Sequence, residues 1–313
     1  MTYPMTAPIR CLCGTPRFAI VHTYAVAPAG ETPYACSTTT PYWRQSWRCE
    51  LCGHFLAVHG MDMHGLYTGD YVSSTYGEDG MQRAFERIIA LPPAQSDNLG
   101  RVQRLLAFAA QHFPPTTFVS RPPTVLDVGS GLGVFLHQMR LAGWQCTAID
   151  PDARAVRHAR ERVGVTAVCG DFMASQELGR FDVVTFNKVL EHVTDPVSML
   201  ARSAQHLREG GFVYIELPDG EAALVEGPQR QEFFIDHWHV FSAASLAILA
   251  TRAGFQLQAL ERLHEPSGKY TLRAFLVPVP DATGLPPVCA ERPAERLTST
   301  EHAAGIVYSV PIE

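Results

Sequence analysis

A glycine-rich turn is the first feature of this sequence that could do chemistry. Gly129, Ser130, Gly131 and Gly133 follow a β-branched run and precede an apolar segment with helical spacing. Small residues let a ligand approach the backbone, and a helix that starts there presents free N–H groups to an anionic group such as a carboxylate. The dinucleotide-binding pattern needs a further glycine where Val134 stands, so the turn alone does not specify the ligand.

Three aspartates near this turn are placed to bind a nucleoside. Asp127 precedes the turn and can anchor an ammonium group, directly or through water. Asp150 ends the next predicted strand, 21 residues after Gly129, and can accept hydrogen bonds from both ribose hydroxyls. Asp171 ends the third strand and can accept from an adenine amino group. Each acid alone could simply cap a helix, but three at successive strand ends favour a ligand site.

The elements that must position these residues are those of an α/β fold. From Pro123 onward, short β-branched runs alternate with amphipathic helices, which is typical of a doubly wound, mostly parallel sheet. Strands are expected at 124–128, 146–149, 165–168, 182–186, 212–216, 255–260 and 270–277. Helices are expected at 81–90, 97–112, 134–142, 152–162, 196–207 and 243–253, with Gly210 and Gly211 ending the fifth.

Residues 124–277 resemble the class I S-adenosylmethionine (SAM)-dependent methyltransferases. The similar segments are LDVGSGLGVF, AIDPD, GDF, FDVVTFNKVLEHV and LREGGFVYIELPD. The resemblance implies a Rossmann-like fold and a SAM cofactor, and it says little about the acceptor. It further implies that the methionine part of SAM lies at Asp127, Gly129, Ser130, Gly131 and Gly133, the ribose at Asp150 and Pro151, the adenine at Asp171 and Phe172, and the sulfonium beside the backbone from Asn187 to Leu190.

Two cysteine pairs near the N-terminus suit a tetrahedral Zn²⁺ site. Each pair is followed by a glycine, which lets backbone N–H groups turn toward the thiolates. The first pair is one residue shorter than the common C-x-x-C, so His54 or Cys36 could replace a ligand, and unligated thiols are the alternative. Four thiolates leave no open position, which favours a structural rather than a catalytic metal. The predicted ligands are Cys11, Cys13, Cys49 and Cys52.

A zinc ribbon before this fold resembles two groups of enzymes. One is the sugar-modifying methyltransferases, including C-methyltransferases of nucleotide-linked deoxysugars and polysaccharide-tailoring enzymes; the other is the zinc-ribbon rRNA guanine methyltransferases. Residues 1–75 carry four arginines and four acids, and the chain has a formal net charge of −6. Because no basic stripe is visible, the charge favours the sugar-modifying group over nucleic acid. The tyrosine-rich segment 66–71 and Tyr76 also resemble the entry segment of those enzymes.

Histidines and one tyrosine are the candidates for acid–base chemistry. Methyl transfer is an in-line displacement, so the enzyme must align the acceptor and, for a hydroxyl or carbon acid, remove a proton. Glu191 and His192 follow the fourth strand beside the expected methyl group, and the segment after the fifth strand carries two more histidines. A packed or capping role is the alternative for these, and Glu191 and His192 could instead orient the cofactor. The candidate catalytic residues are His192, His237, Glu191, Tyr76 and His239.

The 313 residues are expected to form a zinc-ribbon module at 1–60, a linker and helical lid at 61–115, a SAM-binding domain at 116–280 and a partly disordered tail at 281–313. No apolar run reaches membrane-spanning length, and the N-terminus has no signal-peptide pattern, so a cytoplasmic location is expected. The predicted function is methylation of a small molecule, a sugar or nucleotide-linked sugar, at oxygen or carbon. An rRNA or tRNA methyltransferase and a non-catalytic partner-binding protein are the alternatives.

Overall fold

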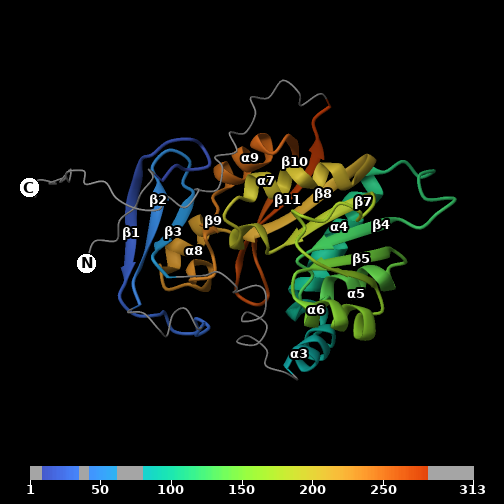
Figure 1. The fold of residues 1–313 in the computed structure, drawn as a ribbon, viewed down its shortest axis with the longest axis horizontal. Helices are drawn as coiled ribbons and strands as arrows, with labels where there is room; N and C mark the ends of the chain where they lie inside the picture. The colour runs from blue at the N-terminus through green and yellow to red at the C-terminus, as the bar shows by residue number, and fades with distance from the viewer. Residues whose placement is uncertain (1–8, 35–41, 62–79, 281–313) are drawn as a thin grey trace, which may run out of the picture.

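The computed structural model describes residues 9–34, 42–61 and 80–280, which contain two β-sheets (Figure 1). The larger sheet consists of β4 (Thr124–Val128), β5 (Gln145–Asp150), β6 (Thr166–Cys169), β7 (Phe181–Asn187), β8 (Leu207–Pro218), β10 (Phe255–His264) and β11 (Tyr270–Pro278). Their spatial order is β10-β11-β8-β7-β4-β5-β6, with β10 and β11 antiparallel to their neighbours and the other five parallel. The chain runs outward from β4 to β6 and then returns to the other side of β4. The carboxyl ends of β4 and β7 therefore border the topological switch point, where open parallel sheets bind ligands.

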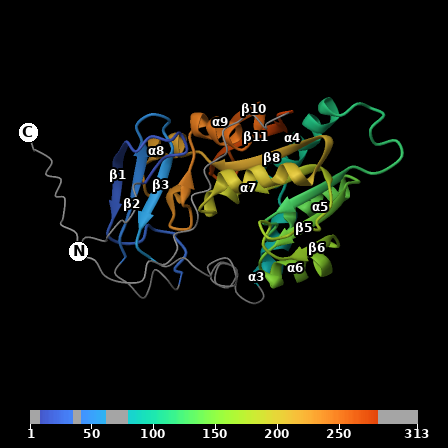
Figure 2. The same cartoon turned by 45° about the horizontal axis from the view of Figure 1, so that its top comes forward.

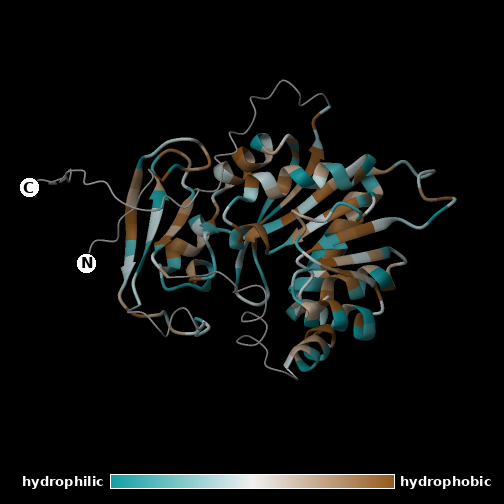
Figure 3. Ribbon diagram, in the orientation of Figure 1, coloured by the Kyte–Doolittle hydropathy of each residue, from teal (hydrophilic) through white to brown (hydrophobic). Residues whose placement is uncertain are grey.

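Helices cover both faces of the larger sheet. One face packs against α4 (Asp97–His112), α5 (Val134–Leu141) and α6 (Ala153–His158), and the other against α7 (Pro196–Arg202) and α9 (Ala243–Arg252). Side chains alternate between the faces, so that Val183 joins the first core and Val184 the second. Figure 3 shows brown, hydrophobic stretches along these strands. Burial on both faces explains why the strands are nearly continuous apolar runs in the sequence.

The fold class predicted from the sequence is confirmed, and most element boundaries agree within a few residues. Helix α3 (Gly80–Ile89) matches the helix predicted at 81–90. Helix α4 begins after Ser96, whose hydroxyl accepts from the Leu99 N–H. Helix α9 begins after Ser242, which forms reciprocal capping hydrogen bonds with Ser245. A serine thus caps each of these helices directly before the first residue predicted for it, Asp97 and Ala243.

The prediction that Gly210 and Gly211 end a helix was wrong. Helix α7 ends at Arg202, a 3₁₀ turn covers Ser203–His206, and both glycines lie inside β8. The register shifts where β8 pairs with β7, which marks an irregularity, and Gly210 adopts a φ of +73° there. A Cβ on Gly211 would lie 2.8 Å from the carbonyl oxygen of Asp182. These glycines therefore permit an irregular strand rather than a helix terminus.

The smaller sheet is antiparallel and consists of β1 (Phe18–Tyr24), β2 (Arg44–Cys49), β3 (Phe55–His59) and β9 (His239–Val240). Strand β9 follows β8 in the chain, so residues outside 1–60 complete this N-terminal sheet. Helix α8 (Gly220–Glu226) packs on it, with Ala223 against Phe55. Figures 1 and 2 show the smaller sheet beside the larger one. The sequence predicted neither α8 nor β9.

Three of the predicted segments lie partly or wholly outside the described residues. These parts are 1–8 and 35–41 of the zinc-ribbon module, 62–79 of the linker, with Tyr76, and the whole tail 281–313. Within the described ranges, no helix is long and apolar enough to cross a membrane.

Candidate active site

A cavity of about 810 Å³ opens at the carboxyl ends of the parallel strands, at the topological switch point. This volume is within the range of ligand pockets in proteins. The turn after β4, the ends of β5 and β7, the segment 231–237 and residues 30–34 all contribute to its walls. The predicted site residues that line it are Asp127, Gly129, Ser130, Gly131, Asp150, Pro151, Asp171, Phe172, Asn187, Glu191, His192 and His237.

The glycines of the turn have left-handed backbone conformations. The φ angles of Gly129, Gly131 and Gly133 are +67°, +49° and +66°. A Cβ on Gly129 would lie 2.8 Å from Val189, and one on Gly133 would lie 2.8 Å from Val163. A Cβ on Gly131 would meet nothing within 4 Å, because this residue faces open space. Gly133 is outside the cavity lining and shapes the turn from behind, whereas Gly131 leaves room for a ligand.

Asp127 and Asp150 are buried carboxylates beside this turn. Asp127 accepts from the Thr185 hydroxyl at 2.6 Å and from the Asn187 amide at 2.8 Å, and burial raises its pKa to about 6. Asp150 accepts from the backbone N–H of Gly131 and of Asp152, both at 2.9 Å, and burial raises its pKa as well. A carboxylate has about four acceptor positions, so both acids retain acceptor capacity for a ligand.

The third aspartate, Asp171, is exposed at the mouth of the cavity. It accepts from the Met173 N–H at 2.8 Å. The next residue, Phe172, is buried, and its carbonyl accepts from the Arg202 guanidinium at 2.8 Å. Asp150 and Asp171 therefore both accept hydrogen bonds from the backbone that follows their strands, which is the capping role considered as the alternative. Both also line the cavity.

Two histidines, His192 and His237, lie next to each other in the part of the cavity formed by the end of β7 and the segment 231–237. The rings of His192 and His237 lie 4.8 Å apart, centre to centre. His192 Nδ1 lies 2.8 Å from the carbonyl oxygen of Asp236, and His237 Nδ1 lies 2.8 Å from that of Glu232. Because a carbonyl can only accept, Nδ1 carries the hydrogen in each ring. The acceptor nitrogen of each neutral ring is then Nε2, which is the arrangement a general base requires.

Glu191 completes this cluster. Its side chain is fully buried, and neither carboxylate oxygen has a hydrogen-bond partner among the described residues. The ligand atoms of Glu191, His192 and His237 lie within 4.8 Å of one another, close enough to hold a common ion. A buried carboxylate without partners is costly, so this group is placed for a ligand or for an imidazolium formed beside it.

Glu31 joins the N-terminal region to the segment that carries His237, and its neighbours Gly30 and Thr32 line the cavity. Its carboxylate accepts from Arg44 at 3.0 Å and from Tyr42 at 2.5 Å, and it also accepts from the Ile235 N–H at 2.8 Å. These bonds tie the loop before β2 to the segment that carries His237. The smaller sheet thereby fixes part of the cavity wall.

His239 and Leu190 lie apart from the cavity lining. Leu190 is fully buried in the core that covers the α7 face of the sheet. His239 Nδ1 lies 2.9 Å from His54 Nε2, and burial lowers the His239 pKa to about 4. The His239 ring is therefore buried and neutral, which agrees with the packing role considered as the alternative. The structure supports no catalytic role for it. Tyr76 lies outside the described residues.

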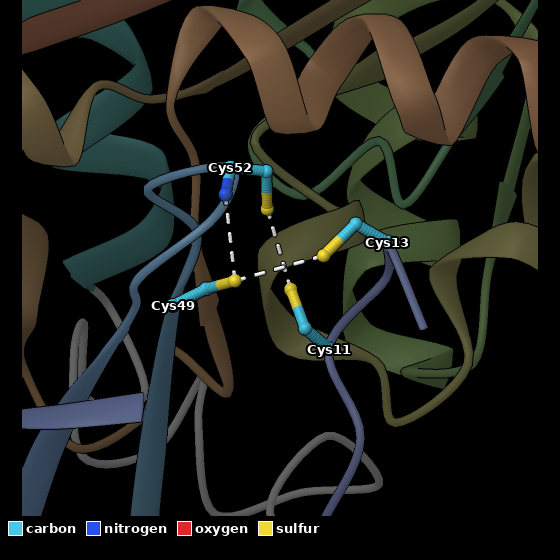
Figure 4. A group of neighbouring side chains, drawn as sticks. All are labelled: Cys11, Cys13, Cys49 and Cys52. Carbon is cyan, nitrogen blue, oxygen red and sulfur yellow. Dashed lines mark hydrogen bonds between the residues drawn. The ribbon is translucent and has the colours of Figure 1, made fainter. Parts of the chain in front are cut away.

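The four N-terminal cysteines form one cluster (Figure 4). Cys11 Sγ lies 3.3 Å from Cys52 Sγ, Cys13 Sγ lies 3.6 Å from Cys49 Sγ, and all four sulfurs lie within 4.8 Å of one another. A tetrahedron with Zn–S bonds of about 2.3 Å has sulfurs about 3.8 Å apart, so the set fits zinc. The Cys52 N–H points to Cys49 Sγ at 3.5 Å. His54 bonds Ser245 and His239 instead of joining the cluster, and Cys36 lies outside the described residues.

The electrostatics of the cluster also fit a bound cation. Burial raises the pKa of the Cys11 thiol strongly and that of Cys52 to about 11. Burial also acts to raise the pKa of Cys49, but hydrogen bonds from backbone N–H groups and neighbouring thiols outweigh it and lower this pKa to about 7. A bound cation would favour the thiolate forms of Cys11 and Cys52, whose pKa values burial raises.

The cavity is also lined by residues that sequence reasoning did not single out. Arg101 comes from α4, and Lys269 comes from the β10–β11 hairpin. Their place in the site depends on tertiary packing, and no local pattern could have found them. Lys188 and Asp236 could have been found from the sequence. Lys188 lies in the segment Asn187 to Leu190 expected beside the sulfonium, and Asp236 directly precedes the candidate residue His237.

Comparison with known families agrees with this geometry. The family model described as a methyltransferase domain matches residues 94–260, which is more than half of the chain. The chain therefore belongs to this methyltransferase family.

Particular relatives match shorter stretches. The ubiquinone biosynthesis O-methyltransferase of Aromatoleum aromaticum is 38% identical over 97 residues, which are 29% of this chain and 42% of the relative. The enzyme of the same name from Xanthomonas axonopodis pv. citri is 32% identical over 159 residues, 45% of this chain and 66% of the relative. The chain thus spans about two fifths of the length of the first relatives that it matches.

A solved structure supports the fold. The magnesium protoporphyrin IX methyltransferase of Synechocystis PCC 6803 with bound S-adenosylhomocysteine has a TM-score of 0.51 and 16% sequence identity. The match covers 67% of this chain and 97% of that one. At this identity the likeness concerns the arrangement of helices and strands.

Proposed function

We propose that this protein is a SAM-dependent methyltransferase acting on a small molecule. The observation that carries the proposal is the single cavity that joins the glycine turn and its aspartates to the Glu191, His192 and His237 cluster. One part suits a nucleoside with a charged tail, and the other suits proton removal. We further propose the division into residues 1–60, 61–115, 116–280 and 281–313, with β9 completing the N-terminal sheet.

The cofactor-binding residues fit SAM by charge and by space. Asp127 would hold the ammonium group, since a buried carboxylate with a raised pKa is stabilised by a cation. Asp150 would accept from the ribose hydroxyls, and Asp171 and Phe172 would border the adenine. Gly131 leaves room for the ligand beside the backbone. When bound there, SAM would supply an electrophilic methyl group.

The acid–base residues would act on the acceptor. His192 or His237 would take a proton at Nε2 from a hydroxyl or an activated carbon, while the Nδ1 hydrogen bonds to backbone carbonyls hold the ring in place. Glu191 would stabilise the imidazolium that forms.

For the acceptor we propose a sugar or a nucleotide-linked sugar. A cluster of carboxylate and imidazole groups can hold the several hydroxyls of such a molecule. A phenolic hydroxyl is the second candidate, because the curated relatives are named as ubiquinone biosynthesis O-methyltransferases and because Phe234 and Tyr270 also line the cavity. Nucleic acid is disfavoured by the net charge of −6.

We also propose that Cys11, Cys13, Cys49 and Cys52 hold a structural Zn²⁺. All four thiolates would be ligands, so the metal would have no open position for a substrate. The cluster packs against α9, and the Ser242 hydroxyl donates to the Cys52 carbonyl at 2.5 Å. Zinc would thereby join the smaller sheet to the larger one.

Binding of S-adenosylhomocysteine by titration calorimetry tests the cofactor assignment. We expect saturable binding at one site per chain. The change Asp150→Ala should weaken it by about 1–3 kcal/mol, because ribose hydroxyls and the Gly131 N–H lose their acceptor. Asp195→Ala is the matched control, since Asp195 also caps a helix but is exposed and outside the cavity lining. Unchanged affinity in Asp150→Ala would refute the ribose assignment.

The affinity for S-adenosylhomocysteine should fall when the pH drops below about 6. In the free protein the Asp127 pKa is raised to about 6 by burial, and the ligand ammonium pairs only with the ionised form. Below this pH a proton must be lost on binding, so affinity should decrease toward tenfold per pH unit, and above it affinity should level off. Calorimetry from pH 5 to 7.5 measures this. In Asp127→Asn we expect weaker binding that no longer decreases below about pH 6. A wild-type affinity that does not change with pH would contradict the role of Asp127.

A further inference from the structure

The chain contains only two lysines, Lys188 and Lys269, and both line the cavity. The other 23 of its 25 basic residues are arginines. Among the described residues that line the cavity, Arg101 is the only arginine. A compact ammonium group is thus found in this chain only at the cavity.

Lys188 has an unusual backbone conformation. Its φ is +61°, and among the described residues no other non-glycine residue has a positive φ. It comes directly after Asn187, which bonds Asp127, and its N–H donates to the Glu216 carbonyl at 3.1 Å. Left-handed conformations of residues with a Cβ are strained and tend to occur where function needs a particular side-chain direction.

The Lys188 ammonium is held by a neutral group. It donates to the Thr271 hydroxyl at 2.6 Å, and within the described residues no carboxylate pairs with it or with Lys269. Glu216 is close by but is occupied, because Arg101 bonds one oxygen and Arg273 and Tyr214 bond the other. An ammonium group has three donors, so Lys188 has donor capacity left for a ligand.

Glu191 is the acid of the cavity wall whose oxygens have no hydrogen-bond partner among the described residues, whereas two others are engaged in ion pairs. Glu232 pairs with Arg230, and Asp152 pairs with Arg154. Burial is the main cause that lowers the Lys188 pKa, while the Glu216 and Glu191 carboxylates act to raise it. Both lysines line the same cavity, so an anion bound there could supply acceptors to both ammonium groups.

We infer that Lys188 and Lys269 form a subsite for an oxyanion carried by the acceptor, a carboxylate or a phosphate group. Lys188 precedes Glu191 by three residues on the loop after β7. An acceptor anchored there would present its reacting atom near the Glu191, His192 and His237 cluster. The inference rests on the proposed function and narrows the acceptor to a molecule with an acidic group, such as a sugar acid or a sugar phosphate.

Calorimetry on the full chain saturated with S-adenosylhomocysteine tests this subsite. Inorganic pyrophosphate is titrated in one arm and malonate in the other, at an ionic strength held constant with sodium chloride. We expect saturable binding of one of the two, and the arm that binds identifies phosphate or carboxylate chemistry. No saturable binding of either anion would overturn the inference.

Substitutions of Lys188 distinguish the effect of its charge on anion binding from the effect of its strained backbone conformation. Lys188→Met should weaken anion binding at least tenfold, and Lys188→Arg should restore part of the affinity. Lys188→Gly, which accepts the positive φ, should lose the anion like Lys188→Met while remaining folded. Arg208→Met removes an exposed charge from the far end of β8 and should change nothing. Anion binding by Lys188→Met and Lys188→Gly at wild-type affinity would also overturn the inference.

The proposed function is judged by a separate measurement. Lys188→Met and Lys188→Arg should still bind S-adenosylhomocysteine, because the segment 187–190 is expected to face the cofactor with its backbone, whereas the Lys188 ammonium donates to Thr271. Failure of the wild type to bind S-adenosylhomocysteine would refute the proposed function itself. Cofactor binding without anion binding would refute only the subsite.

Discussion

The substitution Cys52→Ser is expected to release the bound zinc and to lower the melting temperature by roughly 10 °C. Structural zinc contributes folding free energy directly, and losing several kcal/mol corresponds to about 2–4 °C per kcal/mol in a chain of this size. The effect should reach the larger sheet, because Cys11, Cys49 and Cys52 share a core with Leu246 and Ala250 of α9. Elemental analysis of tag-free protein and calorimetric melting measure both quantities.

The control for this change is Cys169→Ser. Cys169 is an exposed free cysteine outside the cluster, so its replacement should leave both metal content and melting temperature unchanged. About one zinc per chain is expected in the wild type. A wild-type protein that contains no metal and still melts as one unit with an ordered N-terminal sheet would refute the zinc proposal.

The second large effect is expected for His192→Ala. Removing a general base should lower turnover by roughly 10²–10⁴-fold while the affinity for S-adenosylhomocysteine is retained. The measurement is transfer of a labelled methyl group from SAM to an acceptor found by screening sugars, sugar phosphates and phenols. His237→Ala measured beside it decides which ring takes the proton.

His112→Ala is the matched control for the histidine changes. His112 also bonds a backbone carbonyl, that of Gly210, but it lies outside the cavity lining. Its replacement should leave turnover unchanged. If neither His192→Ala nor His237→Ala slowed transfer, the acid–base assignment would be wrong, and catalysis would depend on alignment of the reactants alone.

Local sequence patterns predicted much of the larger sheet for clear physical reasons. Strands buried on both faces must be apolar along their length, so β4 and β7 stood out against the polar segments between them. The predicted starts of α4 and α9 agree with the structure, where a serine caps each helix. The glycine turn and Asp150 could be placed together because the carboxyl ends of neighbouring parallel strands meet at one edge.

What could not be predicted depends on contacts between distant segments. Strand β9 has only two residues, too few for a periodic pattern, and it exists because β3 offers a partner. His239 was a candidate because it follows the fifth strand, but it lies in the interior, where it bonds His54. Gly210 and Gly211 suggested a helix end, whereas Gly210 provides a positive φ inside β8 and Gly211 leaves room for the carbonyl of Asp182. Arg101 reaches the cavity only because α4 packs across Glu216.

A crystal structure of the full chain with S-adenosylhomocysteine tests the central claim most directly. The quantities to measure are the contacts of the ribose and the distance from the ligand sulfur to His192 Nε2 and His237 Nε2. We predict ribose hydroxyls on Asp150, the amino group at Asp127, and a sulfur that faces the histidines with room for an acceptor and at most one water between them. A ligand bound elsewhere, or a sulfur that points away from both histidines, would contradict the proposed active site.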